Sequence, residues 1–99
     1  MKKSLVNMIS KVAISFCARM VQLESVKSPY ANPYGRILYD CIMLEDTSGK
    51  IVYICEDSDG DLMICNKDLS VERYIWHDSN ETLMEKAITL TMGLMQIGF

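Results

Sequence analysis

The sequence predicts an α+β fold: an N-terminal helix, a three- to four-stranded antiparallel meander and a C-terminal helix, with both helices packed on one sheet face. Two observations carry this prediction. Apolar residues recur at steps of three and four near both ends of the chain, which is the spacing of a helix that buries one side. Between these segments lies a stretch rich in β-branched and aromatic residues, and Gly49 and the Asp59-Gly60 pair mark two tight turns within it.

The composition is that of one small globular domain. The chain has 99 residues, of which 49% are hydrophobic, and this size supports a single hydrophobic core. A charged fraction of 23% with a net charge of -3 gives no general affinity for polyanions, because that affinity depends on clustered basic residues. We therefore expect one domain over residues 1–99 and no nucleic acid partner.

The cysteines and the apolar runs indicate the compartment. No two of the four cysteines form a C-x-x-C pair, and all lie in apolar runs: Cys17, Cys41, Cys55 and Cys65. Such thiols serve as small buried hydrophobes, so we expect reduced cysteines, no metal and no cofactor. Asn7 and Lys11 interrupt the N-terminal apolar stretch, and no run approaches the roughly 20 apolar residues that span a bilayer. These features predict a cytoplasmic protein without a membrane segment.

The first helix is predicted from Ser4 to about Ser25. Its apolar residues follow at steps of three and four: Leu5, Met8, Ile9, Val12, Phe16, Met20 and Leu23. The polar side carries too few basic residues to bind an anionic membrane surface. We therefore expect this helix to pack on the sheet. Two prolines in residues 28–35 cannot continue a helix, and they predict a loop.

Residues 37–67 predict three strands of the meander. Two-residue turns at Gly49 and Gly60 would place Leu44 opposite Tyr53, and with this register neither sheet face is polar. An antiparallel sheet that is apolar on both faces is expected to be covered on both, one face by the helices and the other by a second protomer or a partner protein. A bulge in either hairpin would redistribute the side chains between the faces.

Residues 69–77 alternate as a fourth strand does, and their charges predict an edge position. Tyr74 and Trp76 on this strand are candidate partner-binding residues, because aromatic side chains often form the centre of a protein interface. Together with His77 and beside Arg73, they also make a candidate stacking platform for a ring ligand.

The last helix is predicted to begin near Asp78, with Glu81 completing a capping box or with Ser79 as the alternative cap. Two neighbouring apolar stripes then cover nearly half of its surface, which is more than one contact with a sheet requires. Methionines adapt to irregular partner surfaces, and three of them are the candidate partner-binding residues of this helix: Met84, Met92 and Met95.

The turn after the second predicted strand concentrates carboxylates: Glu56, Asp57, Asp59 and Asp61. The aspartates alternate as in the beginning of a calcium loop, but Leu62 stands where the glycine of that loop is required. We therefore expect no bound metal and treat the four residues as candidate partner-binding residues, an acidic tip that docks on a basic groove.

The sequence offers no recognisable catalytic motif. It has one histidine and lacks the nucleophile, phosphate-loop and zinc-protease signatures, so no enzymatic activity is expected. The apolar surplus and the acidic turn favour a small non-catalytic protein-binding module, an inhibitor, immunity-type or adaptor protein that acts by occupancy and forms a homodimer. The alternative is a protein that binds a small ligand or divalent ion through residues 56–61 or the Tyr74 and Trp76 cluster.

Overall fold

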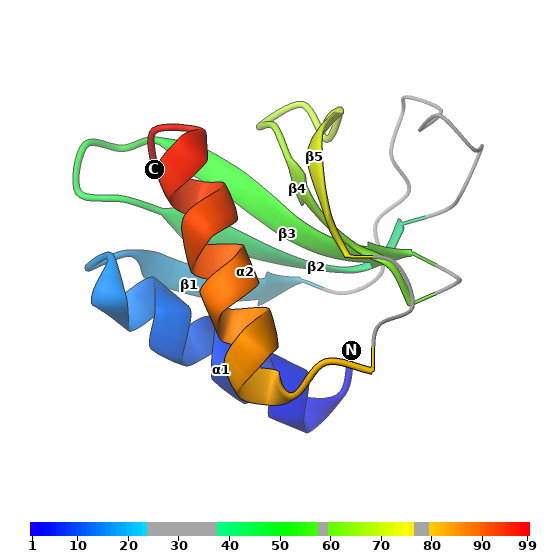
Figure 1. The fold of residues 1–99 in the computed structure, drawn as a ribbon. Helices are drawn as coiled ribbons and strands as arrows, with labels where there is room; N and C mark the ends of the chain where they lie inside the picture. Colours follow the sequence, from blue (N-terminus) through cyan, green and yellow to red (C-terminus); the bar gives the residue numbers. More distant parts are fainter. Residues whose placement is uncertain (24–37, 58–59, 77–79) are drawn as a thin grey trace.

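The computed structural model describes residues 1–23, 38–57, 60–76 and 80–99 and confirms the α+β class. The elements follow in this order: α1 (Lys3–Ser15), β1 (Arg19–Leu23), β2 (Leu38–Glu45), β3 (Ile51–Asp57), β4 (Leu62–Cys65), β5 (Val71–Trp76) and α2 (Leu83–Gln96). The strands form one five-stranded antiparallel sheet in sequence order, and both helices cover the same face of it (Figure 1). The predicted loop of residues 28–35 lies outside the described residues.

The first helix ends about ten residues earlier than predicted, and the chain beyond it supplies an additional strand, β1. The helix ends in a Schellman motif, in which the N–H of Ala18 donates to the carbonyl of Ala13 and that of Cys17 to Ile14, both at 2.9 Å. Cys17 takes the left-handed position of this motif, with φ of 54°. Arg19 then pairs with Glu45 of β2. The sheet therefore has five strands rather than three or four.

The register between β2 and β3 differs by one residue from the prediction because the turn that joins them is longer than expected. The N–H of Gly49 donates to the carbonyl of Asp46, and the N–H of Asp46 donates to the carbonyl of Lys50, both at 3.0 Å. This closes a three-residue loop with Gly49 at φ of 88°, a conformation that glycine adopts without strain. Leu44 consequently lies opposite Val52, not Tyr53.

The shifted register sorts the two sheet faces by residue type. The face under the helices is aliphatic, with six buried side chains: Ile42, Leu44, Val52, Ile54, Leu62 and Ile64. The far face holds the thiol cluster, which consists of four fully buried side chains: Cys41, Cys55, Met63 and Cys65. Since these residues are inaccessible in the single chain, a second protomer is not required to cover them, contrary to the expectation from sequence.

The last helix begins later than predicted, at a different capping box. Thr82, not Asp78, is the N-cap: its Oγ1 accepts a hydrogen bond from the N–H of Glu85, and Glu85 Oε1 accepts one from the N–H of Thr82, both at 3.2 Å. At the other end, Lys50 Nζ donates to the carbonyl of Ile97 at 2.6 Å. Both ends of α2 are therefore fixed, the second one to the β2–β3 turn.

The C-terminal ends of the two helices meet. The rings of Phe16 and Phe99 lie edge to face with centroids 5.6 Å apart. Like α1, α2 ends in a Schellman motif, in which Phe99 N–H donates to Leu94 and Gly98 takes the left-handed position with φ of 80°. Among the described residues, no helix is long and apolar enough to cross a membrane.

Candidate protein-binding surface

The outward side of α2 carries a row of exposed apolar side chains. We call this row the methionine stripe, and it consists of Met84, Ile88, Met92 and Met95, each between 54% and 75% exposed. The residues follow at steps of four, four and three, so they lie along one side of the helix. The opposite side packs into the core through the fully buried Leu90 and Leu94. The helix therefore buries one apolar side and presents another.

The exposed apolar surface is concentrated on this helix. Among the described residues, six large hydrophobic side chains are strongly exposed, and five of them belong to α2: Leu83 and the four residues of the methionine stripe. The sixth is Ile14 of α1, at 70%. Single exposed hydrophobic residues are normal on a protein surface, but a contiguous row marks an interaction site. The three methionines predicted to bind a partner are thus brought together, and Ile88 completes the row.

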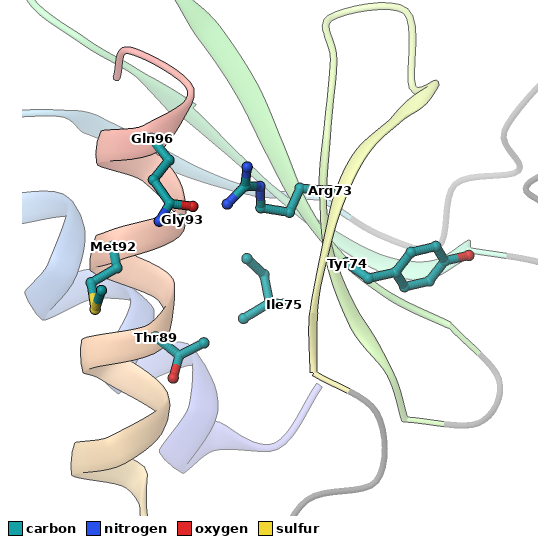
Figure 2. A pocket seen from close by; sticks show the side chains of 7 residues that line it. All are labelled: Arg73, Tyr74, Ile75, Thr89, Met92, Gly93 and Gln96. Atoms are coloured by element: carbon teal, nitrogen blue, oxygen red, sulfur yellow. The ribbon is translucent and has the colours of Figure 1, made fainter.

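A groove lies beside the methionine stripe, between α2 and β5. Its volume is about 330 Å³, and its lining consists of Arg73, Tyr74, Ile75, Thr89, Met92, Gly93 and Gln96 (Figure 2). Gly93 allows the close approach of helix and strand, since a Cβ atom there would lie 2.9 Å from Cδ1 of Ile75 and 3.3 Å from Cδ1 of Ile64. Met92 belongs to both the groove and the stripe, so the two form one continuous surface.

Arg73 places a cation at the rim of this groove. It pairs with Ile64 across the sheet, and in Figure 2 its guanidinium extends from β5 toward α2 in the region of Gly93 and Gln96. The ion pairs found in the described part of the chain are those of the Met1 amino group with Asp40 and of Arg19 with Glu45, so Arg73 has no carboxylate partner there. A guanidinium in this position is suited to a carboxylate supplied by a binding partner.

Tyr74 lines the groove as well, but its side chain does not extend toward α2 as that of Arg73 does. Its side chain points away from α2 in Figure 2 and packs against the thiol cluster on the far sheet face. The backbone of Trp76 lies opposite Leu62 at the end of β5, and its side chain lies outside the described part of the structure. Arg73 and Tyr74 point to opposite faces of the sheet, so these two residues do not form the predicted ring platform together. His77, the remaining residue of that platform, lies outside the described residues.

The acidic residues 56–61 do not form a common exposed tip. Asp61 is only 3% exposed, and Glu56 is half-buried. Glu56 lines a second cavity of about 360 Å³ with Lys2, Ser4, Leu5, Gly60, Glu81, Leu83 and Lys86. Asp57 ends β3, whereas Asp59 lies outside the described residues. Within the described ranges, no three histidine, cysteine or acidic side chains gather as a metal site.

Two thiols of the far sheet face, Cys41 and Cys55, differ in their protonation behaviour. Cys41 lies directly opposite Cys55, and all four cysteines of the chain are free. The hydrogen bond with Cys55 lowers the pKa of Cys41, whereas hydrogen bonds with Cys41 and Cys65, together with burial, hold the pKa of Cys55 far above its ordinary value. Cys55 is therefore a neutral thiol without access to solvent, which does not suit it to nucleophilic chemistry.

Sequence reasoning singled out the methionines but did not select Ile88, Arg73 or Gly93 as site residues. Ile88 follows Met84 by four residues, and Gly93 interrupts an otherwise favourable helix sequence, which is a signal of close backbone approach. The position of Arg73 carried no such signal, because the groove depends on how α2 lies against β5. Comparisons with protein-family models, with curated protein sequences and with solved structures find no match to this chain.

Proposed function

We propose that the protein is a small non-catalytic protein-binding module that acts by occupancy, as an inhibitor, immunity-type or adaptor protein. The observation that carries this proposal is the methionine stripe on the outward side of α2, where Met84 is the most exposed residue. Nothing in the packing of the domain requires apolar residues there, because α2 already contacts the core through Leu90 and Leu94. An apolar row of this kind is typical of a surface that another protein covers.

The stripe fits a partner that receives a helix. Anchors at steps of four, four and three match the way in which an amphipathic helix enters an apolar groove or packs beside another helix. Full burial of a methionine or isoleucine side chain is worth about 1.5–3 kcal/mol, so a few such anchors supply most of the favourable free energy of a moderate complex. The flexible thioethers adapt to the shape of the partner surface.

The cysteines support a reducing compartment as the place of action, and we propose the cytoplasm. All four are free, and Cys41 and Cys55 remain thiols although they lie directly opposite each other on neighbouring strands.

A second candidate function is the binding of a small amphiphilic ligand in the α2–β5 groove. Arg73 at the rim, with Ile75 and Gly93 beneath it, favours a carboxylate attached to a short apolar body. Binding of a divalent ion by residues 56–61 lacks support in the structure, since Asp61 is buried and no acidic cluster forms among the described residues.

The test is affinity capture from a nuclease-treated lysate of the native host with three forms of the protein. The wild-type protein is compared with a Met84→Gln/Met95→Gln double variant, in which glutamine preserves side-chain length and helix propensity. Ile14→Gln is the matched control, because it removes an equally exposed apolar side chain from α1. We expect a stoichiometric partner to bind the wild type and the Ile14 variant and to be lost from the α2 variant. Equal capture by all three forms would refute the assignment of this surface.

A further inference from the structure

We infer that the methionine stripe binds a second copy of this chain, with the two α2 helices antiparallel and the Glu85 carboxylate of each protomer placed at Arg73 of the other. The inference rests on the proposed function, because it names an occupant for the same face of α2.

The stripe is self-complementary along the helix. Its four residues are spread about a midpoint between Thr89 and Leu90. A two-fold axis at this midpoint, perpendicular to α2, places Met84 of one protomer at the level of Met95 of the other and Ile88 within one residue of the level of Met92. Both halves of the interface then bury the same set of side chains, as an isologous dimer requires. The antiparallel arrangement also aligns opposite ends of the two helix dipoles.

The charges along α2 match the same arrangement. Glu85 is exposed and stands four residues before Thr89, which lines the groove, so Glu85 lies on the groove side of the stripe. The two-fold axis turns the second helix end for end but keeps the groove sides of both helices together. Glu85 of the second copy therefore reaches the level of Leu94, next to Gly93, on the side where Arg73 extends toward α2 (Figure 2).

Arg73 and Glu85 are each able to form an ion pair with the other across the dimer interface. Arg73 makes no ion pair within the described part of the chain. Glu85 uses Oε1 for the capping box with Thr82, which leaves its second carboxylate oxygen for a guanidinium. The pair would form twice in each dimer, once at each end of the stripe. The apolar row and the charge pair thus require the same relative position of the two helices.

The other surfaces of the domain are less suited to a second copy. The far sheet face buries its central side chains within one chain. The edge strand β5 has register shifts at two points of its pairing with β4, and such irregular edges resist strand-to-strand association. Among the described residues, the outward side of α2 presents a continuous apolar row beside Arg73 of β5, a cation that makes no ion pair there.

The test is sedimentation equilibrium of the purified full chain from about 1 to about 200 µM, a range that brackets the affinity of a small interface. We expect the wild type to dimerise, and Arg73→Glu or Glu85→Arg alone to weaken the dimer about tenfold, since each creates two like-charge contacts. An equimolar mixture of these two variants should associate like the wild type, because in the mixed dimer both contacts again join opposite charges. A different packing of α2 would not be restored by mixing.

Controls separate charge from folding. Glu85→Gln keeps the capping box and removes the charge, so it should weaken the dimer without loss of helix signal in circular dichroism. Lys11→Glu and Glu72→Arg make the corresponding charge reversals at exposed positions on α1 and β5 and should leave the dimer unchanged. A wild type that is monomeric throughout the range, or a mixture of the two reversal variants that remains monomeric, would overturn the inference.

Sedimentation and lysate capture together show whether the dimer or the heterologous partner has failed. A monomeric wild type that still captures a lysate protein through Met84 and Met95 would retain the binding module and discard the dimer. A dimer with the expected charge dependence that captures nothing would retain the dimer and discard the heterologous partner.

Discussion

Gly93 of α2 lies so close to Ile75 of β5 that a Cβ atom on the glycine would be 2.9 Å from the Cδ1 atom of the isoleucine. The contact sets the distance between helix and strand and thereby the depth of the α2–β5 groove. It also explains a glycine in the middle of a helix, where the residue costs about 1 kcal/mol relative to alanine.

The first prediction concerns this contact. Gly93→Ala should change the free energy of unfolding by less than about 1 kcal/mol, because the gain in helix propensity offsets the displacement of the Ile75 methyl group. In an Ile75→Val background, which removes that methyl group, the same substitution should become stabilising. Urea denaturation of the four proteins gives the coupling free energy. Additive effects would show that the two residues do not constrain each other.

The second prediction compares the ends of the two helices, which share the Schellman motif. Cys17→Gly should stabilise the protein by about 0.5–1 kcal/mol, since the left-handed conformation costs an L-residue about 1–2 kcal/mol and part of the gain is lost to the entropy of the unfolded chain. Gly98→Ala should destabilise by a similar amount at the corresponding position of α2. Cys17→Ala is the control: if it stabilises as much as glycine, the thiol and not the backbone is responsible.

The third prediction concerns access to the thiols. In the folded protein an aromatic disulfide reagent should modify one of the four cysteines rapidly, the exposed Cys17, and the other three should react after unfolding in denaturant. A Cys17→Ser variant should show no rapid reaction. Fast modification of further thiols in the native protein would mean that the far face of the sheet opens readily.

The fourth prediction is a pH dependence. Hydrogen bonds from the Ser48 hydroxyl and from the N–H groups of Lys50 and Ser48 hold the pKa of Asp46 below its ordinary value of 3.8. A carboxylate with a lowered pKa in the folded state stabilises the fold above pH 3.8, and this contribution is lost as the pH falls through the folded-state pKa.

Asp46→Ala should therefore lower the urea midpoint at neutral pH and have little effect at about pH 2, where the wild-type side chain is protonated as well. Glu72→Ala is the comparison for loss of an exposed charge outside a turn. An equal decrease of the midpoint at both pH values would point to a contribution of Asp46 other than its charge.

The sequence was sufficient to predict both helices and four of the five strands, but not strand β1 or the ends of the helices. Met20 and Leu23 continue the helical spacing of the first segment, yet they belong to β1, because Cys17 terminates the helix in a conformation usually taken by glycine. The registers failed for a related reason. The loop beginning at Asp46 has one residue more than a two-residue turn, and a shift of one residue exchanges the sheet faces.

The part of the binding surface that lies on α2 alone could be predicted from sequence. The part that lies between α2 and β5 could not. Met84, Met92 and Met95 fall on one side of a single helix, so local spacing placed them together. Arg73 and Gly93 are twenty residues apart, and their proximity follows from tertiary packing of α2 on β5. For the acidic turn, local spacing could not distinguish the buried Asp61 from an exposed side chain.

The contact of Phe16 with Phe99 has a consequence for the order of folding. Every strand of the sheet pairs with its sequence neighbours, and the connections from β2 to β5 have four or five residues, so these hairpins can assemble at small entropic cost. The aromatic contact, in contrast, joins two positions separated by most of the chain. During synthesis the aliphatic side of the sheet stays partly uncovered until α2 has emerged, and attachment of this last helix is then the step that turns a set of hairpins into a cooperative domain.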